Sequence, residues 1–142
     1  MKTNDLFQQF VGFIASVHQM SSEMTRDIPT GELTPAQYKI MEYLMVSQPI
    51  TLSEISECIH MSMPNTSREL RKLTDKGLCE KVTDPQDRRK QLIRLSDQGS
   101  ALMNDIFQTV RERFAQRTAA LSDAEKVQIE QAITLLRQKI LD

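Results

Sequence analysis

The stretch TLSEISECIHMSMPNTSRELRKLTDKG, residues 51–77, decides the fold. It opens on the capping-box pattern TLSE, and apolar residues then recur at helical spacing as far as His60. Ser62 can cap a second helix, which Gly77 ends. A helix of about two turns therefore meets a second helix through the short turn at His60 and Met61, and this is helix-turn-helix spacing.

The period of the apolar residues changes after this segment. LCEKVT at 78–83 and QLIRLS at 91–96 are two short strand-like runs. They flank DPQDRRK at 84–90, so we predict a β-hairpin with a long tip. A helix-turn-helix followed directly by a basic hairpin describes a winged helix-turn-helix.

The segment that precedes residues 51–77 also begins as a helix. Thr34 can cap it, Pro35 fits its first position, and Gln37 can reach back as the capping-box partner. Residues 48–49, Gln-Pro, end it.

Further helices are predicted at both ends of the chain. Residues 4–26 carry apolar side chains at helical spacing, and residues 27–31 break the pattern. A long helix is expected over 97–119, and the capping box SDAE at 122–125 opens the last one.

The bulk numbers set broad limits. At 142 residues, with 39% hydrophobic and 26% charged residues, the chain is typical of one soluble globular domain. No apolar run approaches the length of a membrane span, and MKTNDLFQQF lacks the apolar core of a signal peptide. We therefore expect a cytoplasmic protein.

Charge is distributed unevenly along the chain. Residues 61–95 hold nine Lys or Arg and five Asp or Glu, a net charge of +4. The chain as a whole is −1, so the remaining residues carry −5. This segregation marks the hairpin and the helix before it as the place for a polyanion contact.

The helix at 62–76 carries an unusual polar face. Short polar side chains and arginine match the donors and acceptors of a DNA major groove, whereas they are poor interior helix residues. The alternative is a plain N-cap cluster on a solvated helix. The polar and basic side chains concerned are Ser62, Asn65, Thr66, Ser67, Arg68, Arg71 and Lys72.

The hairpin tip combines cations with two acids. Arg88, Arg89 and Lys90 project where they can reach phosphates or enter a minor groove. Asp84 and Asp87 can orient a neighbouring guanidinium, since an acid holds its fork in one geometry. They can equally just solvate the turn.

The chain resembles a MarR-family transcriptional regulator. The resemblance is carried by LTPAQYKIMEYL (33–44), ITLSEISECIHMSMPNTSRELRKLTDKGLCEKV (50–82) and DPQDRRKQLIRLSDQG (84–99). The last segment is close to the family's wing signature, in which two aspartates precede an arginine. The match spans roughly residues 33–100, and the flanking helices match in placement rather than in motif.

This resemblance implies a sequence-specific repressor that binds palindromic double-stranded DNA as a homodimer. The helix at 62–76 would enter the major groove and Arg89 the neighbouring minor groove. The DNA-binding residues predicted on this basis are Thr51, Ser53, Ser62, Met63, Pro64, Asn65, Thr66, Ser67, Arg68, Arg71, Lys72, Arg88, Arg89 and Lys90.

The predicted fold class is mainly α with a small β-hairpin wing, as one MarR-like domain over 1–142. The DNA-binding lobe would span 33–96, with dimerisation helices at 4–27 and 97–141. The apolar stripes of the terminal helices suit a dimer interface, although such stripes also form monomer cores. The interface residues predicted are Phe7, Phe10, Ile14, Ile129, Ile133, Leu136 and Ile140.

Two modes of control are compatible with the sequence. Relatives of this kind lose DNA affinity when a small aromatic or phenolic effector binds between the lobe and the dimer helices. Such a ligand must bind two conformations differently. The candidate lining residues are His18, Met20, Met24, Met41 and Met45, for which core packing is the alternative.

Redox control is the second mode and would use Cys58 or Cys79. It requires an accessible thiol of low pKa, and both cysteines read more simply as small buried residues. A metal site is not expected, because only two histidines are present and no paired Cys/His spacing occurs.

Two other classes of function compete with DNA binding. An enzyme is not supported, since the sequence has no Gly-rich phosphate loop, HExxH or nucleophile elbow. No cofactor is implied. A protein-interaction winged helix would not need the basic cluster at the wing.

Overall fold

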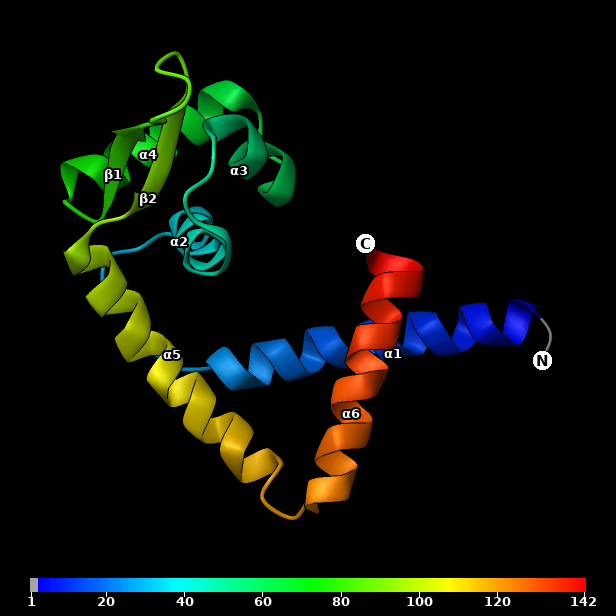
Figure 1. Ribbon diagram of the computed structural model, residues 1–142. Helices are drawn as coiled ribbons and strands as arrows, with labels where there is room; N and C mark the ends of the chain where they lie inside the picture. Colours follow the sequence, from blue (N-terminus) through cyan, green and yellow to red (C-terminus); the bar gives the residue numbers. More distant parts are fainter. Residues whose placement is uncertain (1–2) are drawn as a thin grey trace. The chain divides into compact units, whose positions relative to one another are not determined.

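The computed structural model describes residues 3–142 of the chain (Figure 1). The order of elements confirms the predicted fold class, a mainly helical chain with one antiparallel hairpin. The elements are α1 Thr3–Thr25, α2 Pro35–Ser47, α3 Leu52–Ile59, α4 Met63–Asp75, β1 Cys79–Thr83, β2 Gln91–Leu95, α5 Asp97–Arg117, α6 Asp123–Leu136 and a π-helical turn, η1, Arg137–Leu141.

Helix starts lie where the capping patterns place them. The Thr34 hydroxyl accepts the Gln37 N–H at 3.2 Å, and the Gln37 side chain accepts the Thr34 N–H at 3.2 Å. The same reciprocal pair joins Ser122 and Glu125 at the start of α6. The expected capping boxes at these two helices are confirmed.

The turn of the helix-turn-helix depends on a left-handed residue. His60 has φ 56° and ψ 43°, and its N–H donates to the Ser56 carbonyl at the end of α3. The Met61 N–H donates to the same carbonyl at 3.2 Å. Ser62 then caps α4 by accepting the Asn65 N–H at 3.2 Å. Two backbone donors and one hydroxyl therefore fix the short turn between the helices.

The hairpin pairs Cys79 with Leu95 and Thr83 with Gln91. Ile50, which precedes α3, adds a bridge to it: its N–H donates to the Ile93 carbonyl, and the Ile93 N–H donates back. This third pairing was not predicted from the sequence. The two hydrogen bonds join the hairpin to the segment just before α3. Ile50 and Ile93 are both buried, so these bonds lie within the core.

The chain divides into two compact units, each of which is described by itself. Unit 1 consists of Met1–Met24 and Val110–Asp142, and unit 2 of Thr25–Thr109. Unit 2 contains the whole predicted lobe and the first part of α5. Its core collects side chains from α2, α3, α4, the hairpin and α5, namely Ile40, Met41, Leu44, Ile50, Ile55, Leu70, Leu73, Leu78, Cys79, Ile93, Leu95, Met103 and Ile106.

The start of α5 presses on the backbone of unit 2 at Gly99. A Cβ placed there would lie 2.0 Å from the Leu78 carbonyl oxygen, which no real side chain tolerates. The Ser96 hydroxyl accepts the Gly99 N–H and donates to the Gly77 carbonyl. Glycine is therefore required where α5 meets the strand entry.

Unit 1 is built differently. Within the described span of α6, Asp123–Leu136, no residue is buried. Its polar ties run between α1 and the end of α5: Arg113 donates to the Glu23 and Met24 carbonyls, and Arg117 pairs with the Glu23 carboxylate at 3.2 Å. Helix α5 ends at Arg117, two residues before the predicted end at 119.

Candidate nucleic-acid interface

Helix α4 presents a polar and basic face to solvent. Its N-terminal residues Ser62, Met63, Pro64 and Asn65 are all exposed. Asn65 gives its backbone N–H to the Ser62 cap, and its exposed side-chain amide is accessible to an outside partner. The helix N-terminus adds a partial positive charge that favours an anion, while Pro64 has no N–H and the Asn65 and Thr66 N–H groups already donate to Ser62.

The basic residues of α4 continue this face. Arg68, Arg71 and Lys72 are exposed. Lys72 also pairs with Glu69 one turn earlier, at 3.4 Å. Ser67 is half-buried at the edge of the face.

Thr66 corrects the predicted set. Its side chain is fully buried, with 0% exposure, and its hydroxyl donates to the Ser62 carbonyl at 2.8 Å. The prediction that Thr66 faces DNA is wrong, because Thr66 lies on the side of α4 that packs into the core. The helical spacing of Thr66, Leu70 and Leu73, which share the buried side, was the available signal.

The two residues predicted on α3 lie at its first turn. Thr51 accepts the Glu54 N–H, and its hydroxyl donates to the Glu54 carboxylate at 3.2 Å. The Thr51 hydroxyl thus both accepts and donates within the helix cap. Thr51 is half-buried. Ser53 is exposed beside it.

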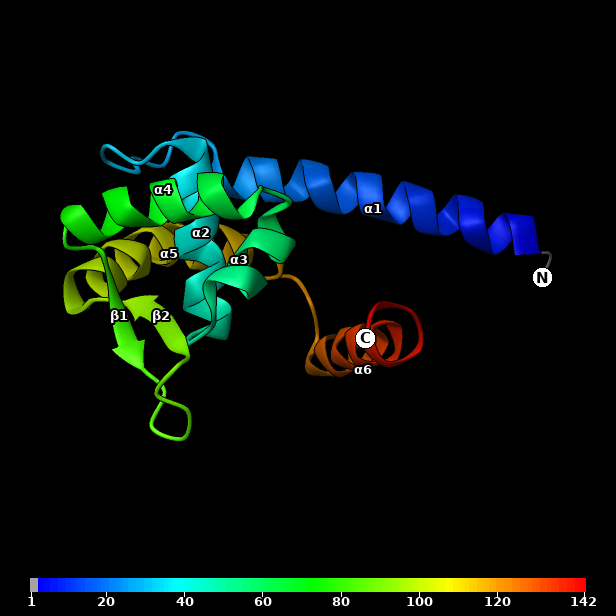
Figure 2. The ribbon, with the colours of Figure 1, turned by 90° about the horizontal axis from the view of Figure 1, so that it is seen from above.

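The hairpin tip extends beyond the helices of unit 2 (Figure 2). Arg88, Arg89 and Lys90 are exposed there, and the Arg89 side chain has a relative exposure of 93%. Asp87 Oδ1 accepts both the Arg89 N–H, at 3.1 Å, and the Arg89 Nε–H, at 3.3 Å. The predicted orienting contact to a guanidinium is therefore present at Asp87.

Asp84 acts on the turn backbone instead. Its carboxylate accepts the Gln86 N–H at 2.8 Å, and its own N–H donates to the Lys90 carbonyl at 3.1 Å. These two bonds set the curvature of the loop, so Asp84 orients the tip without touching a guanidinium.

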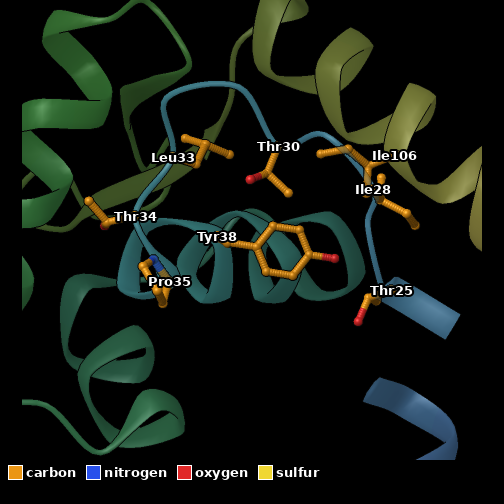
Figure 3. A pocket seen from close by; sticks show the side chains of 8 residues that line it. All are labelled: Thr25, Ile28, Thr30, Leu33, Thr34, Pro35, Tyr38 and Ile106. Atoms are coloured by element: carbon orange, nitrogen blue, oxygen red, sulfur yellow. The ribbon is translucent and has the colours of Figure 1, made fainter. Parts of the chain in front are cut away.

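A cavity of about 230 Å³ lies beside α2 in unit 2. Figure 3 shows the Tyr38 ring at its centre, with the loop before α2 around it. Apart from Tyr38, the lining comes from the end of α1, the connecting loop, the start of α2 and the middle of α5: Thr25, Ile28, Thr30, Leu33, Thr34, Pro35 and Ile106.

The Tyr38 hydroxyl is the chemical feature of this cavity. It is buried and makes no hydrogen bond of accepted geometry with any described residue. Burial and the nearby Glu42 carboxylate raise the pKa of Tyr38 to about 12, so the phenol stays protonated near neutral pH. The cavity therefore contains one neutral phenol donor, which lies beside the Glu42 carboxylate without a hydrogen bond of regular geometry to it, and the sequence did not indicate this donor.

The residues predicted for a ligand cleft are not among those that line this cavity. Met41 is fully buried in the core of unit 2, where the Cys79 thiol donates to its sulfur at 3.7 Å. Met45 packs partly buried against the same core. Assigning Met41 to a cleft was therefore wrong. His18, Met20 and Met24 lie on α1 in unit 1, His18 exposed and the two methionines half-buried.

The two cysteines differ. Cys79 is buried, as expected, and burial raises the pKa of its thiol to about 12, which opposes thiolate formation. Cys58 is exposed, so the expectation that it is a small buried residue is wrong. It borders a surface hollow with His60 and Tyr43.

Two kinds of feature are absent from residues 3–142. No group of three or more His, Cys, Asp or Glu side chains comes together there as a metal site. No helix in that range is long and apolar enough to cross a membrane.

A short first helix, a left-handed turn, a polar second helix and an adjoining basic hairpin define a winged helix-turn-helix protein. Residues 33–91 match the MarR family model, which covers this lobe. The lobe is therefore similar to the MarR family, as the resemblance indicated.

Two curated relatives align over most of the chain. The multiple antibiotic resistance protein MarR of Escherichia coli (strain K12) is 24% identical over 129 residues, 88% of this chain and 90% of that protein. The HTH-type transcriptional regulator MhqR of Bacillus subtilis (strain 168) is 23% identical over 123 residues, 87% and 85% of the two chains. Such relatives are regulators and not enzymes, in agreement with the prediction.

Solved structures share the fold. A MarR family protein from Bacillus stearothermophilus superimposes with a TM-score of 0.75 at 21% identity, over 100% of this chain and 99% of that one. S. aureus MepR bound to ethidium bromide gives 0.65 at 22% identity, over 99% and 97%. A MepR mutant bound to an oligodeoxyribonucleotide gives 0.58 at 22% identity, over 99% of both chains.

Proposed function

We propose that this protein is a dimeric repressor that binds palindromic operator DNA. Helix α4 would lie in the major groove and the hairpin tip at the neighbouring minor groove. The observation that carries the proposal is the pairing of two exposed elements in one unit: the polar start of α4 and the Arg88–Lys90 tip. The oligodeoxyribonucleotide complex of the similar MepR mutant supports it.

Each part of this interface has a separate task. Asn65 is the residue for base contact, because its amide can pair with an adenine edge. Arg68, Arg71 and Lys72 would neutralise phosphates and set the salt dependence. Arg89, held by Asp87 at 3.3 Å, would enter the minor groove with its guanidinium already oriented.

Changing Arg89 to alanine tests the wing. Affinity for the specific duplex should fall by about 1–3 kcal/mol while the dimer persists. Arg111→Ala is the matched control, since Arg111 is an exposed arginine in unit 1. A salt titration should show steep weakening for the wild type. Unchanged affinity in Arg89→Ala would remove the wing from the mechanism.

The dimer is supported by the apolar side chains that unit 1 leaves uncovered. Phe7, Ile14, Ile129, Ile133 and Ile140 are between 42% and 68% exposed. Phe10 and Leu136 are half-buried. Ile129 and Ile133 also border a groove of about 300 Å³ with Phe114. A second copy of the chain would cover these faces, because a stable monomer rarely exposes so large an apolar area.

The Tyr38 cavity favours release of DNA by a small aromatic or phenolic effector. A cavity of about 150 Å³ can hold benzene, so about 230 Å³ fits one substituted ring. The Tyr38 hydroxyl would donate to an oxygen of the ligand, since it makes no hydrogen bond of regular geometry to the Glu42 carboxylate beside it. The ethidium complex of MepR supports ligand binding within this fold.

Phenol and benzoate are suitable probes for this effector site. Tyr38→Phe should weaken their binding about fivefold or more, through loss of one hydrogen bond. Tyr43→Phe is the control, because Tyr43 lies on the same helix and lines a different hollow. Equal affinity for both probes in Tyr38→Phe and the wild type would contradict the effector site.

A further inference from the structure

The Gln37 side chain joins three segments of unit 2 and is almost completely buried, with 2% exposure. It lies on the first turn of α2 and reaches α4, 32 residues later in the chain. A buried amide normally has all its groups paired, and pairing here requires partners on two different elements.

Both ends of the amide have partners. Gln37 Nε2 donates to Glu69 Oε2 at 3.0 Å. Gln37 Oε1 accepts the Thr34 N–H at 3.2 Å and the Lys76 ammonium at 3.3 Å. The amide thus contacts the middle of α4 through Glu69 and its C-terminal end through Lys76.

Glu69 and Lys76 strengthen the connection. The hydrogen bond from Gln37 is the largest cause that lowers the pKa of Glu69, and the Lys72 ammonium adds to it. The carboxylate is therefore charged, and its side chain is only 18% exposed. Lys76 also donates to the Glu32 carbonyl at 3.3 Å, so the loop before α2 is tied to α4 a second time.

We infer that Gln37 is a positioning residue for DNA recognition, which fixes the angle of α4 on α2 through Glu69 and Lys76. This inference rests on the proposed function of α4. Glu69 follows Asn65 by one helical turn, so the clamp formed by Gln37, Glu69 and Lys76 holds α4 at the edge of the face that carries Asn65 and Lys72. A rotation of α4 about its axis would move Asn65 away from the base edges while leaving the phosphate contacts of Arg68, Arg71 and Lys72 partly intact.

The clamp also lies next to the Tyr38 cavity, the proposed effector site. Thr34, which caps α2 and donates its N–H to Gln37, also lines the Tyr38 cavity. The clamp therefore lies between that cavity and α4, within a single unit.

Gln37→Met tests the inference, since methionine keeps the length of the side chain and removes its polar groups. Affinity for the selected duplex should fall about tenfold, and affinity for a shuffled duplex should change less than about twofold. Thr74→Val is the control, because it removes a hydroxyl bond within α4, to the Leu70 carbonyl, that lies outside the clamp.

Exchanging the side chains at positions 37 and 69 tests whether the lost specific affinity can be restored. Gln37→Glu alone should lose specific affinity, because two carboxylates then face each other. With Glu69→Gln added, the donor and acceptor change places, and the new carboxylate on α2 can still accept from the Thr34 N–H and the Lys76 ammonium. The double variant should return to within about threefold of the wild type.

The outcomes separate a structural role from a positioning role. A lower melting temperature with an unchanged ratio of specific to shuffled affinity in Gln37→Met would overturn the inference. Failure of the double variant to recover would overturn it too. If the wild type itself does not distinguish the two duplexes, the proposed function fails instead.

Discussion

Unit 2 buries most of its apolar side chains in one core, whereas unit 1 leaves many of its own apolar side chains exposed. Thirteen hydrophobic residues of unit 2 form one closed core, and its outer face carries the cations of α4 and the wing. In unit 1, no residue within the described span of α6 is buried, and Phe7 is 68% exposed. Unit 2 is thus complete as a folded body, while unit 1 has surface that suits a second chain.

Under the proposed function, this contrast separates two tasks within one short chain. A lobe with its own core can hold α4 and the hairpin in a defined geometry for DNA. Helices that lack a covered apolar face gain stability by pairing with a copy of themselves, and pairing two lobes matches a palindrome. Substitutions in either unit can therefore break one task and spare the other.

The largest effect is expected from Ile133→Glu in unit 1. A charge buried in an apolar interface should weaken dimerisation about 100-fold or more. Sedimentation velocity should then show monomers, and DNA binding should fall with the dimer. The control is Gln131→Glu, which adds the same charge on the opposite side of α6. A persistent Ile133→Glu dimer would place the interface elsewhere.

Gly99→Ala should give the next largest effect and concerns unit 2. Helix propensity alone predicts a gain of about 1 kcal/mol for this change. The 2.0 Å approach of the new Cβ to the Leu78 carbonyl oxygen should reverse the sign, to a loss of about 2–3 kcal/mol. Ala101→Gly, at an exposed position two residues on, should lose only about 1 kcal/mol. Urea unfolding measures both, and a stabilised Gly99→Ala would contradict the close contact.

Asn65→Ala should change sequence preference more than salt dependence. Specific affinity is expected to fall by about 1–3 kcal/mol, with the slope of log affinity against log salt unchanged. Titration of the selected duplex and a shuffled one at several salt concentrations measures both quantities. If all sequences lose affinity equally, Asn65 does not contact bases.

The smallest effect should come from Glu125→Gln in unit 1. Hydrogen bonds from the Ser122 backbone and hydroxyl lower the pKa of Glu125. A lowered folded-state pKa stabilises the protein above the ordinary glutamate pKa and loses that contribution as pH falls through the folded value. The variant should therefore melt slightly earlier than the wild type at pH 7 and equally at low pH. A difference that grows as pH falls would contradict the cap.

Much of unit 2 was predictable because its signals are local. The Thr34 and Ser62 caps, the turn between the helices and the hairpin are set by neighbouring residues, and all appear where the sequence placed them, as does the Ser122 cap in unit 1. The Asp87 contact with Arg89 spans two residues and was predictable for the same reason.

What the sequence did not reveal depends on distant contacts. The Ile50 bridge to Ile93, the Gln37 bond to Glu69 and the Tyr38 cavity each join residues far apart in the chain. Thr66 was misplaced because a polar residue on a polar helix can still turn inward when its hydroxyl bonds the preceding turn. Met41 was misplaced because methionine fits a core as readily as a ligand site.

Selection of bound duplexes from a random pool by the wild-type protein tests the central claim most directly. A dimeric repressor should enrich a palindrome whose half-sites lie about one helical turn, roughly 10 base pairs, apart. The Arg89→Ala and Asn65→Ala variants should bind it more weakly than the wild type. A pool without an enriched palindrome would contradict the account.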